Sequence, residues 1–168
     1  DQPSKVNQNI VVNFYFDGVP LTGFAGDTLA SALLANNVRI LARSFKYHRP
    51  RGIMGAGSEE ANALVTVGSG HEKEPNIRAT QLEIYEGLEV YSQNNWPSLK
   101  FDFLALNDFA APLLAAGFYY KTFMWPKSFW EKIYEPIIRR AAGLGSLSGH
   151  ANQDRYEKAY AFCDLLVI

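Results

Sequence analysis

Residues 10–37 read IVVNFYFDGVPLTGFAGDTLASALLANN, and this stretch decides the fold. Its first seven residues are mostly β-branched or aromatic, which is typical of a β-strand. They end at Asp17-Gly18, a strong signal for a tight hairpin turn. A second short strand is expected over residues 20–24. The opening therefore predicts two antiparallel strands joined by a two-residue turn.

A helix is predicted directly after this hairpin. Asp27 or Thr28 can accept hydrogen bonds from the free N–H groups at the start of the helix. The apolar positions recur at helical spacing and form one face, which consists of Leu29, Ala32 and Leu33. Residues 36–37, a pair of asparagines, are expected to end the helix.

Further strands are expected to return to the same sheet. A short strand is predicted over residues 38–41 and a clearer one over residues 63–67, which read ALVTV. Residues 79–91 have alternating apolar side chains and predict an extended region, with Gly87 as a bulge or turn. A hairpin, one helix and returning strands indicate an α+β fold with the helix on one face of the sheet.

The composition becomes aromatic and helical from Trp96 onward. Residues 97–117 form an amphipathic pattern that Pro112 interrupts. Seven large aromatic residues then lie close together: Phe118, Tyr119, Tyr120, Phe123, Trp125, Phe129 and Trp130. A short helical segment cannot bury so much aromatic surface against its own sheet, so a partner surface is expected there, with ordinary core packing as the alternative.

A second helix is predicted from Ser128 to Arg140. Ser128 and Glu131 have the spacing of a capping box, in which each side chain accepts a hydrogen bond from the backbone of the other residue. Pro136 should kink this helix because it has no N–H group to donate, and Gly143 should end it.

The last part of the sequence has the pattern of a linker followed by a strand. Residues 163–168 read CDLLVI, an acidic residue before a purely apolar run. This is typical of a buried parallel strand, here the expected first strand of a dinucleotide-binding domain; an ordinary edge strand is the alternative. The predicted division is residues 1–95 as the sheet domain, 96–145 as an aromatic helical extension and 146–168 as a linker and strand.

The composition excludes several classes of function. The net charge of −1 and the isoelectric point near 6.3 give no basic field for nucleic acid. The single cysteine, Cys163, rules out an internal disulfide and any multi-cysteine metal site. The longest apolar run, residues 109–120, is shorter than a membrane span, and no apolar leader opens the sequence. A soluble, cytoplasmic protein without membrane contact is expected.

Residues 43–52 read RSFKYHRPRG and concentrate positive charge without any acidic residue. The charged or chargeable side chains are Arg43, Lys46, His48, Arg49 and Arg51. Guanidinium groups bind phosphate and carboxylate through paired hydrogen bonds, while Phe45 and Tyr47 offer faces for stacking. This basic segment is a candidate site for a flavin or dinucleotide phosphate or for a neighbouring subunit, with a solvated run of charge as the alternative.

No catalytic group of side chains is evident. His48, His71 and His150 are far apart in the sequence, and each lies beside glycine, proline or a charged residue. Each is predicted to be a surface histidine, and neither a Ser/His/Asp nor a Cys/His arrangement is expected.

Three stretches, residues 24–36, 43–52 and 55–67, resemble the N-terminal region of the α subunits of heterotetrameric sarcosine oxidases. They are also similar to the plant-type 2Fe–2S ferredoxin domains fused to amine, opine and cyanide-forming dehydrogenases. The resemblance continues through residues 96–97, 117–126, 139–145 and the final strand. It implies a β-grasp, ferredoxin-like fold for residues 1–95.

The cluster-binding relatives carry cysteines at the spacing C-x4-C-x2-C, which presents three thiolates from one loop to two irons. Aligned back from the strand at residues 64–67, those positions fall on Gly55, Glu60 and Ala63, and none of them is a cysteine. The resemblance therefore implies a ferredoxin-type domain with no cluster and no metal. Glu60, as a lone carboxylate, is predicted to be a solvated side chain.

The resemblance also implies the function of a parent assembly. Such an oxidase demethylates sarcosine to glycine, hydrogen peroxide and a one-carbon unit that passes to tetrahydrofolate or leaves as formaldehyde. The flavins, FAD and FMN, belong to the β subunit and the subunit interface, whereas NAD and tetrahydrofolate bind the α subunit beyond Ile168. This chain is then a scaffold that binds no cofactor alone, and its partners are the remainder of the α subunit and the other subunits.

Two alternatives remain open. One is an independent β-grasp binding module whose basic segment binds an anionic metabolite or an acidic protein. The other is a working ferredoxin, which would be brown and contain stoichiometric iron after anaerobic purification.

Overall fold

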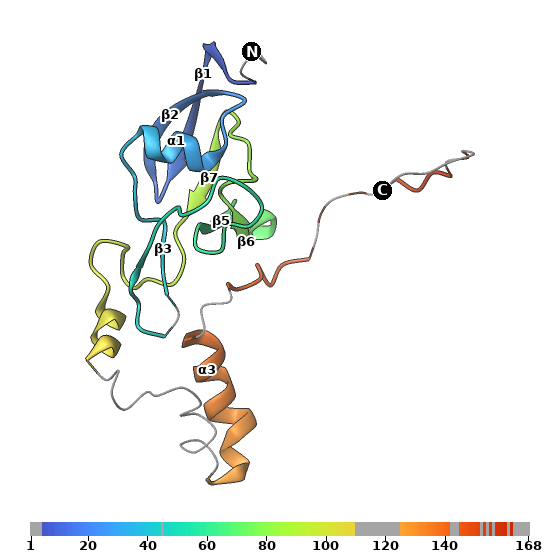
Figure 1. The fold of residues 1–168 in the computed structure, drawn as a ribbon. Helices are drawn as coiled ribbons and strands as arrows, with labels where there is room; N and C mark the ends of the chain where they lie inside the picture. Colours follow the sequence, from blue (N-terminus) through green and yellow to red (C-terminus); the bar gives the residue numbers. More distant parts are fainter. Residues whose placement is uncertain are drawn as a thin grey trace.

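The computed structural model describes residues 5–44, 46–109, 125–141, 145–151, 153, 155, 157–160 and 162. Five strands form a mixed sheet in the order β2-β1-β7-β5-β6. Their bounds are β1 Asn7–Phe16, β2 Val19–Ala25, β5 Leu64–Val67, β6 Glu74–Arg78 and β7 Leu88–Tyr91. Only the β1–β7 pair is parallel. Helix α1 (Leu29–Ala35) lies against β1 and β2 (Figure 1), so the predicted α+β class is confirmed.

The opening hairpin forms as predicted. Asp17 and Gly18 both have positive φ, 49° and 77°, as the two central residues of a type I′ turn require. Burial alternates along the second half of β1, because successive side chains of a strand point to opposite faces. The side chains that face the core are Val12, Phe14 and Phe16.

Helix α1 begins and ends where the sequence predicts. The Thr28 hydroxyl accepts a hydrogen bond from Ser31 N–H (3.2 Å), and Asn36 caps the other end. The buried residues of the helix are Leu29, Ala30, Ala32 and Leu33. Gly23 on β2 permits the close approach of the helix, since an added Cβ would lie 2.5 Å from Ile84 Cδ1 and 3.1 Å from Ala32 Cβ.

The strand predicted over residues 38–41 is wrong. Val38 N–H donates to Leu33 O (2.8 Å) at the end of α1, so this backbone closes the helix and does not join a sheet. A two-stranded ladder forms just beyond it, between β3 (Ala42–Arg43) and β4 (Pro50–Arg51). The basic segment is therefore a hairpin of its own.

The region predicted to be extended over residues 79–91 contains one strand only, β7. The residues before it bond to the first turn of α1: Leu29 N–H donates to Leu82 O and Ala30 N–H donates to Ala79 O. Gly87 makes the expected turn with a φ of 78°. Strand β6 was not predicted, because its sequence is largely polar and contains Pro75, as an edge strand allows.

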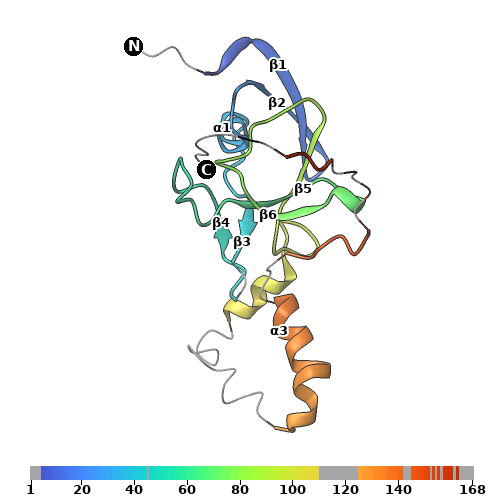
Figure 2. The same cartoon turned by 90° about the vertical axis from the view of Figure 1, so that its right-hand side faces the viewer.

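Helical turns make up the described part of the extension. After the sheet come two 3-10 helices, a π-helical turn and an α-helix: η2 (Phe103–Asp108), η3 (Lys127–Phe129), η4 (Trp130–Tyr134) and α3 (Glu135–Ala141). A further 3-10 turn, η1 (Gly70–Glu72), lies between β5 and β6. Helix α3 lies beyond the β3–β4 hairpin, away from the sheet (Figure 2).

The helix predicted from Ser128 is present, but its capping box is not. Ser128 lies inside η3, whose cap position is Pro126 and has no side-chain cap. Glu135 N–H donates to Trp130 O, which makes the turn before Pro136 a π-helical one. Pro136 has no N–H group to donate to the carbonyl four residues earlier, and the π-helical turn lies directly before it.

Several predictions concern residues outside the described ranges. These are the stacking face of Phe45, the helix break at Pro112, the aromatic residues Phe118, Tyr119, Tyr120 and Phe123, the helix end at Gly143 and the final strand over residues 163–168. Within the described ranges, no helix is both long enough and apolar enough to cross a membrane.

Candidate functional site

The basic segment folds into a tight hairpin between β3 and β4. Ser44 N–H donates to Arg49 O (2.9 Å) and His48 N–H donates back to Ser44 O (3.0 Å). The Ser44 hydroxyl also accepts a hydrogen bond from Arg49 N–H (3.0 Å). These bonds hold Ser44 beside His48 and Arg49, and the side chains determine what the segment contacts.

The carboxylate of Asp102 contacts two side chains of this hairpin, Arg43 and His48. Its carboxylate oxygen Oδ2 lies 2.7 Å from His48 Nδ1 and 3.5 Å from Arg43 Nε. The other oxygen, Oδ1, accepts hydrogen bonds from Trp96 N–H (3.0 Å) and Leu104 N–H (3.2 Å). The Asp102 side chain is fully buried. A single carboxylate thus joins the hairpin to the start of η2.

The prediction that His48 is a surface histidine is wrong. The residue is 3% exposed, because its ring packs against Asp102 at hydrogen-bond distance. His71 and His150 are exposed, as predicted, and His71 lies 3.7 Å from the Glu72 carboxylate. No signal in the sequence marks the His48–Asp102 pair, since the two residues are 54 positions apart.

Arg43 is turned toward the protein and not toward solvent. Its guanidinium donates to Leu99 O from Nε and Nη2 (3.1 and 2.8 Å) and to His48 O from Nη1 (2.8 Å). These bonds leave little of the group for a ligand. Arg43 is a tie between the hairpin and the segment that precedes η2.

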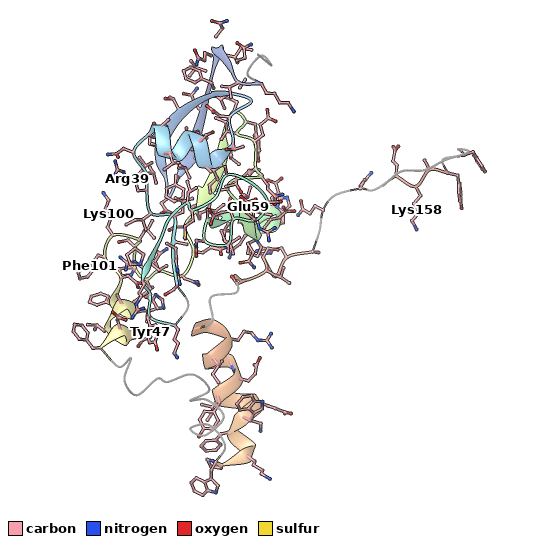
Figure 3. The ribbon with its side chains drawn as sticks, in the orientation of Figure 1. Arg39, Tyr47, Glu59, Lys100, Phe101 and Lys158 are labelled. Atoms are coloured by element: carbon pink, nitrogen blue, oxygen red, sulfur yellow. The ribbon has the colours of Figure 1, made fainter. Side chains whose placement is uncertain are left out.

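The rest of the basic segment is more accessible. Arg49 donates to Asp108 Oδ1 from Nε and Nη2 (3.1 and 2.9 Å) and lies 4.8 Å above the Tyr47 ring. The Lys46 ammonium lies 4.9 Å from the same ring, and Arg51 is exposed on β4. Tyr47 lies beside η2, at the tip of the hairpin (Figure 3). The absence of acidic residues inside the segment is thus offset by Asp102 and Asp108 from the extension.

Aromatic side chains surround η2. The Trp96 and Phe103 ring centroids are 5.6 Å apart, and those of Phe101 and Phe103 are 4.9 Å apart in an edge-to-face arrangement. All three rings are more than 45% exposed, and Phe109 and Trp125 are more than 80% exposed. Of the seven aromatic residues for which a partner surface is predicted, the described ones are Trp125, which is 83% exposed, and Phe129 and Trp130, which are each 43% exposed; a partner surface there stays a prediction.

Glu60 is buried, so the prediction of a solvated side chain is wrong. The residue is 2% exposed. Its Oε2 accepts hydrogen bonds from Met54 N–H (2.6 Å) and Gly55 N–H (2.5 Å), and its Oε1 accepts one from Asn62 N–H (2.7 Å). The glycine-rich loop, residues 52–63, folds around this carboxylate. Its backbone N–H groups provide the hydrogen bonds that water would otherwise supply.

The environment of Glu60 lowers its pKa. Burial by itself favours the neutral acid, but the N–H groups of Gly55, Asn62, Met54 and Ala63 bond to the charged form and together outweigh burial. The pKa of Glu60 therefore lies below its ordinary value, and the carboxylate is ionised at neutral pH.

This shift predicts a pH dependence of stability. A depressed pKa in the folded state contributes stability above the pKa of the unfolded chain, near 4.5, and the contribution is lost as the pH falls through the lower folded pKa. Wild type should therefore lose more unfolding free energy than Glu60→Gln between pH 7 and pH 3, as measured by urea unfolding. Glu86→Gln is the comparison: Asn13 also lowers the pKa of that carboxyl, so its pH curve should differ from wild type in the same direction, but by less because the group is exposed to solvent. Parallel pH curves for wild type and Glu60→Gln would contradict this prediction.

The loop does not fit an iron–sulfur cluster. Of the positions that the C-x4-C-x2-C spacing selects, Gly55 has no side chain, Ala63 is fully buried and apolar, and Glu60 is engaged with backbone N–H groups. None offers a thiolate. Over the residues that the structure describes, no group of three or more His, Cys, Asp or Glu could hold a metal ion.

Comparison with known proteins places these features in context. Residues 10–95 match the family described as "2Fe-2S iron-sulfur cluster binding domain". The chain is 64% identical over 163 residues to the sarcosine oxidase subunit alpha of Rhizobium meliloti (strain 1021), which covers 97% of this chain and 16% of that protein. It is 42% identical over 90 residues to the corresponding subunit of Corynebacterium sp. (strain U-96), covering 52% of this chain and 9% of that protein.

A second Corynebacterium protein, the sarcosine oxidase subunit alpha of strain P-1, is 55% identical over 90 residues and also covers 52% of this chain and 9% of its own length. The chain thus spans a sixth or less of the curated relatives that it matches. Among solved structures, L-proline dehydrogenase from P. horikoshii is similar over 54% of this chain and 17% of that chain, with 25% identity and a TM-score of 0.42.

Proposed function

The chain belongs to the family of 2Fe-2S iron–sulfur cluster binding domains, and from this premise we propose that it is a cluster-free module of the α subunit of a multisubunit, flavin-dependent sarcosine oxidase. The observation that carries the proposal is the 64% identity to such a subunit over 97% of the chain. The identity includes the extension after residue 95, which lies outside the family match.

The module acts as a scaffold and not as a catalyst. Its buried polar groups serve the fold: Asp102 joins the hairpin to the extension, and Glu60 organises the glycine-rich loop. His48, the histidine with a carboxylate neighbour, is almost fully buried and lies beside no nucleophilic side chain in the described bonds. Buried groups of this kind cannot reach a substrate to transfer a proton, but they can hold a neighbouring surface in position.

The chemistry belongs to the rest of the assembly. The flavins of that assembly would supply the two-electron oxidation of the N-methyl group of sarcosine, with O2 as the electron acceptor that becomes hydrogen peroxide. The products would be glycine and a one-carbon unit, which is released as formaldehyde with the uptake of water or transferred to tetrahydrofolate. This chain alone binds no cofactor; FAD, FMN, NAD and tetrahydrofolate belong to the parent assembly, and the module contributes contacts to the remainder of the α subunit and to other subunits.

The proposal is tested on the complete polypeptide that contains these residues, purified with the subunits that accompany it. Sarcosine-dependent oxygen consumption, bound flavin and no stoichiometric iron are expected. A native polypeptide that contains no further domain and copurifies with no flavoprotein would instead favour an independent binding module. Stoichiometric iron with visible absorbance would favour a working ferredoxin.

Within this assembly, the accessible face of the basic segment contacts a flavin or dinucleotide phosphate or a neighbouring subunit. Arg49 and Arg51 are its exposed guanidinium groups, whereas Arg43 and His48 are turned inward. The Arg49–Asp108 pair is exposed on both sides, so a competing anion can displace Asp108 at little cost, since such pairs contribute about 0–1 kcal/mol.

Arg49→Ala combined with Arg51→Ala is expected to reduce flavin retention or subunit assembly of the intact complex by at least about tenfold, because two charged contacts of about 1.5–3 kcal/mol each are removed and about 1.4 kcal/mol corresponds to tenfold. Bound flavin is measured by absorbance and assembly by analytical ultracentrifugation. The matched control is Arg39→Ala with Lys100→Ala, which removes two exposed charges outside the segment (Figure 3). Equal flavin content and assembly in both double variants would exclude this role.

A further inference from the structure

The loop over residues 54–63 is built around one buried anion. Three backbone N–H groups, from Met54, Gly55 and Asn62, point at the two oxygens of the Glu60 carboxylate at 2.5–2.7 Å. Of the ion pairs in the described part of the chain, none involves Glu60. The hydrogen bonds described for this carboxylate come from backbone N–H groups, as in the anion-binding concavities called nests.

A second set of bonds holds the loop in this shape from outside. Arg78 Nε on β6 donates to Glu60 O (3.1 Å), and the Thr80 hydroxyl donates to Gly57 O (2.8 Å). Glu60 N–H donates to Gly57 O (3.3 Å) and closes the turn. The loop backbone is thus fixed to the sheet, and its inward N–H groups need an acceptor whether or not Glu60 supplies one.

The position of Glu60 in the sequence identifies what this acceptor replaces. Gly55, Glu60 and Ala63 have the C-x4-C-x2-C spacing at which cluster-binding domains present thiolates. A cluster with thiolate ligands is an anion whose sulfurs accept hydrogen bonds from the surrounding loop. In this chain the N–H donors of such a loop are present, the thiolates are not, and the donors converge on a carboxylate that comes from the middle ligand position.

We propose that the Glu60 carboxylate stands in for the iron–sulfur cluster as the internal anion around which the loop over residues 54–63 folds. The domain then keeps a cluster-type loop without metal. Its loop stability depends on a negatively charged acceptor at this point, and not on the volume of a side chain.

Glu59 provides a matched comparison in the same loop. It is exposed and accepts one hydrogen bond, from Gly57 N–H (3.2 Å). Figure 3 shows it on the loop beside β5 and β6. Glu59→Ala and Glu60→Ala remove the same atoms and the same charge from adjacent positions, so the difference between them measures the buried acceptor alone.

The test is thermal unfolding of the 168-residue chain at pH 7, followed by circular dichroism. Glu60→Ala is expected to lower Tm by about 10 °C or more, because three N–H groups lose their acceptor, whereas Glu59→Ala should change Tm by less than about 2 °C. Sodium formate at about 200 mM should raise the Tm of Glu60→Ala by about 4 °C, since a free carboxylate can occupy the nest. At equal ionic strength, formate should change the Tm of wild type and of Glu59→Ala by less.

Two further variants separate charge from volume. Glu60→Met fills the space without an acceptor and should be as unstable as Glu60→Ala within a few degrees. Glu60→Gln keeps one oxygen but directs an NH2 group at an N–H donor, and it should fall between wild type and Glu60→Ala. A Tm for Glu60→Met or Glu60→Gln within about 2 °C of wild type would overturn the proposal, as would a formate effect that is the same in all variants.

Glu60→Ala that does not accumulate in folded form is examined by refolding from urea with and without formate. A higher refolded yield with formate, absent for Glu59→Ala, supports the internal anion. Equal yields with and without formate overturn it. The outcome is independent of sarcosine oxidase activity, because every readout is the stability of this chain.

Discussion

Asp102→Ala is expected to lower the free energy of unfolding by about 3–5 kcal/mol, because it removes a buried carboxylate and takes away the acceptor from the groups that bond to it. His48 Nδ1 lies 2.7 Å from this carboxylate, and Trp96 and Leu104 donate their N–H groups to it. The imidazole of His48 cannot replace this bond with one to water unless the chain moves, since the His48 and Asp102 side chains are 4% and 0% exposed.

The measurement for Asp102→Ala is urea unfolding followed by tryptophan fluorescence. Asp108→Ala is the control: it removes a carboxylate from the same extension, but Asp108 pairs with Arg49 at the surface, where the loss should be less than about 1 kcal/mol. Equal losses for the two variants would show that Asp102 does not hold the hairpin to the extension.

Phe14→Ala is expected to cost about 3–5 kcal/mol of unfolding free energy through the cavity that it creates. Phe14 is 0% exposed and lies on the central part of β1, opposite Leu21 on β2 and Leu88 on β7. Three strands lose packing at once, and the surrounding sheet cannot collapse into the space because both neighbouring strands are fixed by their ladders.

Tyr15→Ala is the matched control for Phe14→Ala. The adjacent side chain points to the other face of β1 and is 42% exposed, so its loss should cost about 1 kcal/mol or less. Chemical denaturation of both variants, with equal m-values, gives the comparison. A loss below 2 kcal/mol for Phe14→Ala would mean that the core does not centre on β1.

Local signals account for the parts of the fold that the sequence predicted. Asp17-Gly18 requires positive φ at both positions and forms the hairpin turn, and Thr28 accepts the free N–H of Ser31 at the start of α1. Each of these features depends on residues within four positions of one another. The strand β6 lacks such a signal, because an edge strand can be polar and contain proline.

The errors at His48 and Glu60 have a common physical cause. A polar side chain becomes buried when distant groups satisfy it, and nothing next to His48 in the sequence announces Asp102. For Glu60 a signal was present in the sequence. Residues 52–57 contain three glycines, which leave backbone N–H groups accessible to an acceptor, and Glu60 follows three residues later. The absence of cysteine at Gly55, Glu60 and Ala63 is read directly from the sequence, whereas the burial of Glu60 by backbone N–H groups was missed.

The bond between His48 and Asp102 bears on how this module can be transplanted. The family match ends at residue 95, yet the counter-charges of the β3–β4 hairpin, Asp102 and Asp108, come from the chain that follows. A polypeptide that ends at residue 95 would leave His48 and Arg43 without the Asp102 carboxylate. We therefore expect that a unit able to fold by itself includes Asp102 and the start of η2, and that a fusion or exchange between enzymes needs its junction beyond that point.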